Sequence, residues 1–227
     1  MKVSREQVAE HRQQILEAAS RLFRERGYDG VTVAEIMGAA GLTHGGFYGH
    51  FASKDDLIAH TLAYLSPHQP PAGADRPAEA DLATYRAGYL SPSHRDDRAG
   101  GCPVAALGGE TVRQSPEARA AMTDSLRRQL ARFAATAPGG DAAARRRAAI
   151  GNWAAMVGAV ILARLSDDPA LSDEVLQQTR AWLEAPAAGA PAAKATTKAA
   201  AKATTKVAAK ATTGKSAGRA RPRRTPA

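Results

Sequence analysis

Three side chains near the amino end could hold phosphate groups. Tyr48 and His50 can donate hydrogen bonds to phosphate oxygens. Lys54 places a cation at the predicted start of a helix, where the backbone itself attracts anions. All three lie in the run GLTHGGFYGHFASKDDL, beside the consecutive glycines Gly45 and Gly46. Glycine costs roughly 1 kcal/mol relative to Ala inside a helix. Close approach of the backbone to a ligand is a reason to keep two of them there.

Short helices must position these groups. Thr32 as N-cap, with Glu35 three residues later, forms a capping box that predicts a helix over 33–40. Gly41 ends this helix, and Thr43 can cap a second one over 43–49. A third helix begins after Ser53. Helix, glycine turn and helix is the arrangement that places a recognition helix in the major groove of DNA. An ordinary helical hairpin has the same pattern.

The spacing of apolar residues divides the second helix into two faces. Phe47 and Phe51 lie four residues apart and are expected to anchor it on Ile36 and Ala40 of the helix before. The residues left for the outer side are Thr43, His44, Gly45, Tyr48 and His50.

The run GLTHGGFYGHFASKDDL resembles the helix-turn-helix signature of the TetR family of bacterial transcriptional regulators, and ILEAASRLFRERGYDGVTVAEI resembles the helix before it. The resemblance implies that phosphates are held by Thr32, Tyr48, His50 and Lys54. It also implies that Thr43, His44 and Gly45 face base edges. Gly46 and Gly49 offer no side chain, so base reading would depend on Thr43 and His44 or on DNA shape.

Composition favours an all-α, intracellular protein. Aromatic residues make up only 5% of the 227 residues and alanine is abundant. The single cysteine excludes an internal disulfide framework and fits a reducing cytoplasm. The longest apolar run, 153–163, is too short to span a bilayer, and the polar start predicts no signal peptide. We therefore expect a cytoplasmic, nucleoid-associated protein without a membrane partner.

The net charge of +9 is concentrated at the carboxyl end. Residues 185–227 hold six lysines, four arginines and no acid, so the remainder of the chain carries −1. Residues 1–60 hold seven basic and eight acidic residues. Directed hydrogen bonds and helix N-termini, rather than net charge, must therefore provide any affinity of this part for DNA.

The basic tail is built from eight-residue Ala/Lys/Thr repeats and is predicted to be disordered when free. It resembles the tails of linker histones and of some bacterial nucleoid proteins. Its cations would bind DNA without reading sequence, through counterion release. The alternative is a merely solubilising tail. The cations are Lys194, Lys198, Lys202, Lys206, Lys210, Lys215, Arg219, Arg221, Arg223 and Arg224.

Three parts are predicted: a three-helix head over 1–60, a helical body over 61–184 and the tail over 185–227. The helix after Ser53 should end near Ser66, because prolines follow. In the body, helices are expected over 82–90 and after Cys102, Ser115, Asp141 and Asp168, with SPSHRDDRAGG as a polar loop.

The run YLSPSHRDDRAGGCPVAALGGE resembles a loop and helix of one group of TetR-like regulators, which extends the resemblance to residue 184. It implies a ligand-binding body and a homodimer formed by the last two helices. Met156, Val160 and Ala163, beside small residues, suit close helix packing, and Trp182 could anchor an interface. Plain core packing explains the same pattern.

A small-molecule effector of unknown identity would need an apolar cavity with a few polar tips. The candidate lining residues are Tyr85, Tyr89, Val104, Leu107, Leu126, Leu130, Trp153 and Val157, and plain core packing is the alternative for each of them. Cys102 is a candidate redox sensor, because a helix N-terminus lowers the pKa of a thiol. Its alternative role is that of a small buried hydrophobe.

An enzyme is not expected. His94, Asp96 and Cys102 are close in sequence, but nothing positions them as base, orienting group and nucleophile. The histidines lack metal-ligand spacing, and no cofactor is predicted. The sequence and its resemblance together predict a dimeric, ligand-responsive repressor that binds a double-stranded DNA operator. The alternative is an architectural nucleoid protein acting mainly through its tail.

Overall fold

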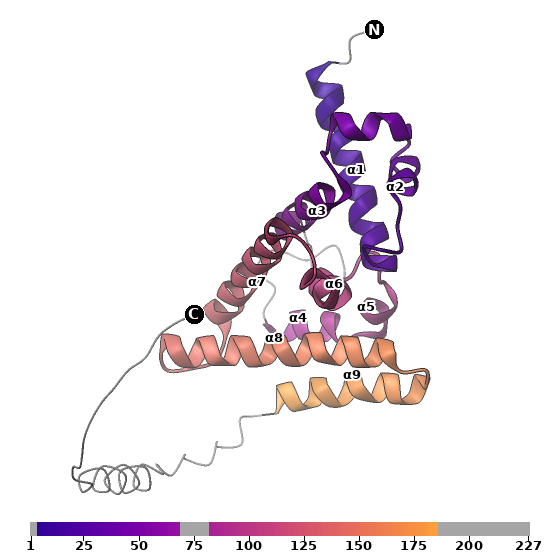
Figure 1. Cartoon of the computed structure of the whole chain (residues 1–227). Helices are drawn as coiled ribbons and strands as arrows, with labels where there is room; N and C mark the ends of the chain where they lie inside the picture. The colour runs from indigo at the N-terminus through magenta and orange to yellow at the C-terminus, as the bar shows by residue number, and fades with distance from the viewer. Residues whose placement is uncertain (1–3, 69–81, 186–227) are drawn as a thin grey trace, which may run out of the picture. The chain divides into compact units, whose positions relative to one another are not determined.

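The computed structural model describes residues 4–68 and 82–185, and the part of the chain that it describes is helical without strands. Residues 1–185 cluster as one compact unit, so the predicted division at residue 60 stays a prediction. The basic tail lies outside the described residues. The elements are α1 (Arg5–Arg26), α2 (Val33–Ala39), the 3-10 helix η1 (His44–Gly49), α3 (Lys54–His68), α4 (Leu82–Tyr89), α5 (Pro92–Asp96), α6 (Pro103–Thr111), α7 (Pro116–Thr136), α8 (Ala142–Leu165) and α9 (Pro169–Glu184) (Figure 1).

Side-chain caps set most helix starts. Ser4 with Gln7 and Thr32 with Glu35 both form complete capping boxes, as the sequence predicts. Ser115, Asp141 and Asp168 accept backbone N–H groups at the starts of α7, α8 and α9. The expected starts of the long helices are therefore confirmed.

Three expectations about local structure are wrong. Residues 44–49 form a 3-10 helix, and Thr43 at its N-cap makes no side-chain capping bond. The stretch SPSHRDDRAGG is not all loop, because Ser91 caps the short helix α5. Helix α3 extends past Ser66 to His68 and includes Pro67, where a missing N–H matters only to its last turn.

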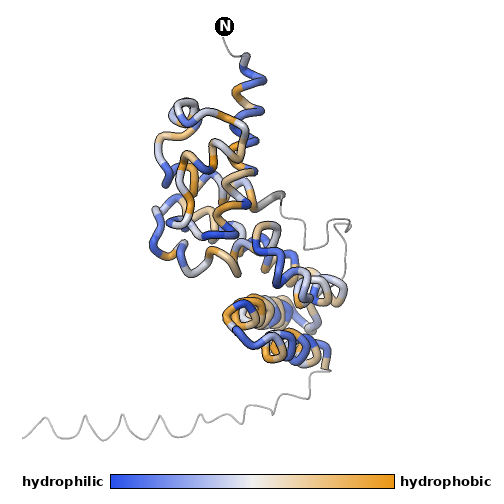
Figure 2. Tube along the Cα trace, turned by 90° about the vertical axis from the view of Figure 1, so that its right-hand side faces the viewer, coloured by the Kyte–Doolittle hydropathy of each residue, from blue (hydrophilic) through white to orange (hydrophobic). Residues whose placement is uncertain are grey.

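Two clusters of buried side chains hold the described chain together. The first joins α1, α2, η1 and α3 to α6 and α7, around Ile15, Phe23, Ile36 and Leu57. The second lies among α4, α7, α8 and α9, around Tyr89, Trp153 and Met156. Helix α3 packs along α7, and α8 and α9 run side by side (Figures 1 and 2). The long helix α7 therefore takes part in both clusters.

Polar contacts also tie the end of α1 to α6. The backbone N–H of Tyr28 donates to Glu110 Oε2 at 2.7 Å, and the Tyr28 and Thr111 hydroxyls lie 3.0 Å apart. Nearby, Arg24 Nη1 donates to the Gly101 carbonyl at 2.9 Å. Burial raises the pKa of Tyr28 to about 12, so its hydroxyl stays protonated and available for this bond at neutral pH.

Helix α8 is long and apolar enough to cross a membrane by length and composition alone. From the shorter run 153–163 alone, the sequence predicts no segment long enough to span a bilayer. A third of the apolar window, 33%, is buried in the described chain, where the helix packs on α7 and α9. Core helices of water-soluble proteins pass the same test, so this is weak evidence for a membrane.

Gly27→Ala is expected to destabilise the protein by about 1–3 kcal/mol, because Gly27 has φ 77° and ψ 172°, a region essentially reserved for glycine. An added Cβ would also lie 2.5 Å from Glu110 Oε1. Urea unfolding followed by circular dichroism measures the change. Gly38→Ala is the control: its Cβ would meet nothing within 4 Å inside α2, so it should stabilise by about 0.5–1 kcal/mol. Equal effects of the two substitutions would contradict the role given to Gly27.

Candidate nucleic-acid interface

Two phenylalanines fix η1 on the helices beneath it. Phe47 and Phe51 are 1% and 2% exposed, and their ring centroids lie 5.8 Å apart. They join Ile36 in the first cluster, and Ala40 packs partly buried against it, as the sequence predicts. Burying two aromatic rings stabilises by several kcal/mol in order of magnitude. Because these rings point inward, the other side of η1 faces out.

The outer face of η1 carries the residues predicted to touch DNA. Thr43, His44, Gly45 and Gly46 are exposed, and the Tyr48 side chain is 70% exposed. An aromatic residue this open to water has its hydroxyl free to meet a partner. The described geometry therefore agrees with the predicted orientation of these residues, while their contacts with DNA stay a prediction.

The glycines of this face have no packing reason to be glycine. A Cβ added at Gly45 or Gly49 would meet nothing within 4 Å, and one at Gly46 would make an ordinary contact of 3.7 Å with Met37. None of the three has a positive φ. Alanine would thus fit in the free protein, and glycine at these positions lets a partner approach the backbone closely from outside.

His50 closes η1 and lies partly buried. Its carbonyl accepts a hydrogen bond from Arg12 Nη1 at 3.0 Å, while the Arg12 guanidinium lies 4.3 Å from the Phe51 ring centroid. Burial lowers the pKa of His50, and the charges of His11 and Arg12 lower it further, so the imidazole is neutral at pH 7. A neutral imidazole still carries one N–H donor.

Arg12 was missed by reasoning from sequence. It lies in the middle of α1, thirty-eight residues before the carbonyl that it contacts. Its two interactions, with His50 and Phe51, make it a positioning residue for the end of η1. No local pattern in the sequence marks such a contact.

The two remaining candidates flank η1 at helix starts. Thr32 exchanges hydrogen bonds with Glu35, so its hydroxyl is already engaged in the capping box. Lys54 begins α3, where Ser53 Oγ accepts the Asp56 N–H at 3.1 Å. Asp56 in turn accepts the Ala52 N–H at 3.0 Å. The start of α3 is therefore rigidly capped, with Lys54 partly exposed beside it.

Only part of the predicted effector pocket comes together. Tyr85, Tyr89, Leu130 and Trp153 are buried in the second cluster, with the Tyr89 and Trp153 ring centroids 5.3 Å apart. Val104 and Val157 pack partly buried against them. Two candidates are wrongly placed: Leu107 belongs to the first cluster and Leu126 is 37% exposed. Both errors arise because helical periodicity does not tell which neighbour a face meets.

We call Tyr85, Tyr89, Phe133 and Trp153 the aromatic cluster. Its rings pack edge to face, tilted or stacked, with centroids 5.0–5.8 Å apart. Trp153 Nε1 is buried there without a hydrogen-bond partner among the described residues. A buried donor left unpaired costs about 1–3 kcal/mol, which a ligand with an acceptor would recover.

Cys102 does not have the lowered pKa expected of it. The thiol is 3% exposed, and burial raises its pKa, which outweighs the lowering by hydrogen bonds from the Val104 and Ala105 backbone at the start of α6. Desolvation disfavours the thiolate more strongly than the helix N-terminus favours it. The buried-hydrophobe alternative fits this geometry, and the redox role loses its physical argument.

His94 joins Cys102 to α4. The Cys102 N–H donates to His94 Nε2 at 3.2 Å, so Nδ1 must carry the proton and donate to the Tyr89 carbonyl, 2.7 Å away. Burial lowers the pKa of His94, which keeps this neutral tautomer at pH 7. His94 is thus structural, and Asp96, the third residue of the discarded catalytic set, is paired with Arg95.

The last two helices expose an apolar groove. Trp182 and Leu162 are 69% and 57% exposed, and the groove of about 440 Å³ between α8 and α9 is lined by Ala155, Gly158, Ala159, Leu162, Gln178, Thr179 and Trp182. Met156, Val160 and Ala163, by contrast, are buried in the second cluster. Core packing is therefore the outcome for these three residues, whereas Trp182 is open to a partner.

No group of three or more His, Cys, Asp or Glu side chains among residues 4–68 and 82–185 could hold a metal ion.

Comparison with known proteins identifies a family and several relatives of this chain. Residues 15–61 match the family model for bacterial regulatory proteins of the tetR family. The chain is 34% identical over 135 residues to the HTH-type transcriptional repressor Rv1474c of Mycobacterium tuberculosis, covering 56% of this chain and 71% of that protein. It is 41% identical over 56 residues to the regulator AcrR of Shigella flexneri, covering 25% of this chain and 26% of AcrR.

Solved structures share the fold of the described chain. The crystal structure of NemR from E. coli in its reduced form has a TM-score of 0.61 at 21% identity, covering 77% of this chain and 95% of NemR. A TetR-family regulator from Agrobacterium tumefaciens has a TM-score of 0.60 at 20% identity, covering 78% and 100%. At this level of identity the likeness shows the fold alone.

Acidification below pH 6.5 is expected to destabilise the protein in part through His94. Its pKa is lower in the folded protein than its usual value of about 6.5, so the unfolded chain binds more protons between these two values. Stability is therefore present above pH 6.5 and is lost as the pH falls towards the lowered pKa. Urea unfolding at a series of pH values measures the slope of the free energy of unfolding against pH.

His94→Asn should lower stability at pH 7.5 and flatten the slope below pH 6.5. His44→Gln, at an exposed position, is the control and should keep the wild-type slope. His50 contributes a slope of the same sign, so the comparison is between variants. A His94→Asn slope equal to that of the wild type would contradict the assignment.

Proposed function

The chain belongs to the TetR family of bacterial regulatory proteins, and we propose that it is a transcriptional repressor that leaves its DNA operator when a small molecule binds the helical body. Its family consists of DNA-binding regulators with a helix-turn-helix head. The proposal assigns no enzymatic reaction to the chain and places it in the cytoplasm. The architectural alternative has no support among the relatives, which are regulators and repressors.

The exposed face of η1 is the observation that carries the DNA-binding part. Phe47 and Phe51 hold η1 down, while Thr43, His44, Gly45 and Tyr48 face outward. The proposed phosphate contacts are those of Tyr48, His50, Lys54 and the helix starts near Thr32 and Lys54. Thr43 and His44 are the side chains proposed to reach base edges.

The aromatic cluster is the proposed effector site. It offers four packed aromatic rings and two buried polar atoms without a hydrogen-bond partner among the described residues, Tyr89 Oη and Trp153 Nε1. An apolar site with few polar groups that fix orientation is the usual design for a small-molecule pocket. The effector proposed for this site has an apolar body and a hydrogen-bond acceptor.

Direct packing provides a route from this site to the DNA-binding face. Phe133 of α7 and Trp153 of α8 belong to the aromatic cluster, and α7 also packs along α3. Helix α6 begins beside the cluster at Cys102 and contacts the end of α1 through Glu110 and Tyr28. Binding that shifts α6 or α7 would change the orientation of α1 and α3. Couplings of about 1–3 kcal/mol are typical of such switches.

A homodimer through α8 and α9 completes the proposal. The exposed Trp182 and Leu162 line a groove between these helices, which a second copy would cover. Two copies of η1 would then read two half-sites of one palindromic operator. The tail, which lies outside the described residues, is proposed to add non-specific affinity through its ten cations.

Gly45→Ala is expected to weaken operator binding by about tenfold or more while leaving the free protein equally or more stable. A methyl group there fits the free protein but stands between the backbone and DNA.

Tyr48→Phe should also weaken binding by about tenfold or more, because it loses one hydrogen bond to a charged group. The operator is first selected from a random DNA library with the wild-type protein. Fluorescence anisotropy then measures affinity.

Gly109→Ala is the matched control. Gly109 lies on α6 rather than on η1, and a Cβ added there would also meet nothing within 4 Å. It should leave DNA affinity unchanged.

A truncation ending at Glu184 should keep its preference for the operator over random DNA and show a shallower salt dependence. Loss of all sequence preference on truncation, or unchanged binding by Gly45→Ala and Tyr48→Phe, would overturn the proposed interface.

Leu162→Glu is expected to convert the dimer into a monomer and to weaken operator binding by about a hundredfold or more, because two linked heads bind far more tightly than one. Leu162 is exposed, so the fold should persist. Light scattering after gel filtration gives the mass. Val112→Glu, at an apolar side chain that is 65% exposed at the end of α6, is the control and should stay dimeric. A dimer that survives Leu162→Glu argues against this interface.

A further inference from the structure

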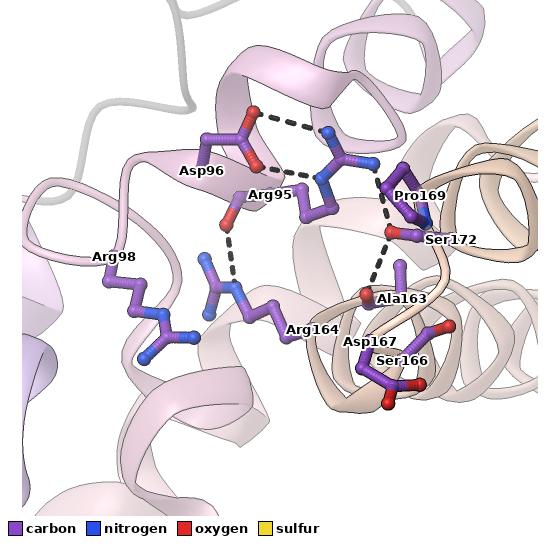
Figure 3. A pocket seen from close by; sticks show the side chains of 9 residues that line it. All are labelled: Arg95, Asp96, Arg98, Ala163, Arg164, Ser166, Asp167, Pro169 and Ser172. Carbon is purple, nitrogen blue, oxygen red and sulfur yellow. Dashed lines mark hydrogen bonds and ion pairs between the residues drawn. The ribbon is translucent and has the colours of Figure 1, made fainter.

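A polar pocket lies away from the aromatic cluster, where α5 meets the turn between α8 and α9. Its volume is about 390 Å³, and Figure 3 shows the side chains around it. Three arginines line it, Arg95, Arg98 and Arg164, together with the acidic residues Asp96 and Asp167. The pairing of these charges decides what the pocket can bind.

The Arg95 guanidinium is paired with two carboxylates of the protein itself. Its Nε donates to Asp96 Oδ1 at 2.7 Å, and its Nη1 donates to Asp173 Oδ1 at 2.6 Å and to Ser172 Oγ at 2.9 Å. These contacts raise the pKa of Arg95 above its usual value. Both Asp96 and Asp173 are therefore committed to this one guanidinium. Figure 3 shows the pairing of Arg95 with Asp96 at the edge of the pocket.

Arg164 and Arg98 have no such partner. Arg164 donates only to backbone carbonyls, from Nε to Arg95 O at 2.9 Å and from Nη2 to His94 O at 3.0 Å. Within residues 82–185 and the described N-terminal part, neither Arg164 nor the Arg98 side chain forms an ion pair, and Arg98 makes no side-chain hydrogen bond. Arg164 is half-buried, where a cation without a counterion is costly.

The two unpaired guanidiniums lie near each other across the pocket (Figure 3). Burial lowers the pKa of Arg164, and the positive charge of Arg98 lowers it further, whereas Tyr89, Cys102 and Asp97 act in the opposite direction. Asp97 uses Oδ1 to accept the Gly100 N–H at 2.8 Å. Asp167 lines the opposite side, and its carboxylate is turned away from both guanidiniums in Figure 3.

We propose that this pocket binds a small carboxylate anion between Arg98 and Arg164. Planar guanidinium groups match the two oxygens of a carboxylate and bind it with parallel hydrogen bonds. The anion fills the space between two like charges and provides the counterion that Arg164 lacks. Asp167 on the opposite side repels a second negative charge, so a single carboxylate fits better than a phosphate dianion.

The site is joined to the amino end by a short chain of contacts. The loop that carries Arg98 ends at Gly101, whose carbonyl accepts a hydrogen bond from Arg24 of α1. Arg164 also holds the carbonyl of His94, whose ring accepts the Cys102 N–H at the start of α6. An anion that orders Arg98 and Arg164 therefore acts on residues that contact both α1 and α6. The site itself does not depend on the proposed effector or on DNA binding.

Titration of the full-length protein with sodium acetate and, separately, with sodium phosphate tests the proposal at constant ionic strength. Backbone amide NMR signals of residues 97–101 and 163–167 are followed, because the basic tail also binds anions but contributes other signals. Acetate is expected to shift these signals with saturation. Arg98→Gln should weaken acetate binding by about tenfold or more, through loss of a charged hydrogen bond.

Arg98 makes no side-chain contact that supports the fold, so Arg98→Gln should unfold at the wild-type temperature. Arg119→Gln, on the exposed side of α7, is the matched control and should bind acetate as the wild type does. Asp167→Asn should improve phosphate binding more than acetate binding. Shifts that do not saturate, or that persist in Arg98→Gln, overturn the site. Tighter binding of phosphate than of acetate by the wild type overturns the assignment to a carboxylate.

Discussion

Burial of Phe47 and Phe51 is the constraint on which the exposed face of η1 depends. Three of the six residues of η1 are glycine, so its backbone has little intrinsic preference for a helix. Both rings are almost fully buried against α2 and α3, and Arg12 fixes the carbonyl at its end. The protein therefore holds a poorly helical segment in place by its inner side chains and leaves the outer side bare. Without this anchor, the polar tips of the segment would have no fixed spacing to present to a duplex.

Packing also connects the amino-terminal helices to the helical body. The link between α3 and α4 passes through residues outside the described chain, so the described connection is made by packing instead. Helix α7 lies against α3 along much of its length, and Glu110 of α6 accepts the Tyr28 N–H that follows α1. Gly27 leaves room for that carboxylate. A change in the body can thus reach α1 and α3 through side chains that are already in contact.

Reasoning from the sequence succeeded where the signal is local. Capping residues such as Ser4, Thr32, Asp141 and Asp168 predicted helix starts, because their bonds span only two or three residues. The inward and outward sides of η1 also followed from the spacing of two phenylalanines. Reasoning from the sequence failed where a contact joins residues that are far apart in the chain. Leu107 entered the wrong cluster, and the Arg12–His50 bond has no local mark. The pKa of Cys102 depends on burial by other helices, so the helix N-terminus alone predicted the wrong direction.

Charge pairing explains more of this molecule than net charge does. Residues 1–60 carry −1 in total, so an interface there must work through directed donors at fixed positions. The polar pocket of the body is lined by three arginines and two carboxylates, and Arg95 pairs with Asp96 of the pocket and with Asp173 beside it. This uneven distribution leaves Arg98 and Arg164 uncompensated at one end. A sum over residues hides both features, because the energy of a charge depends on which neighbour shares its hydrogen bonds.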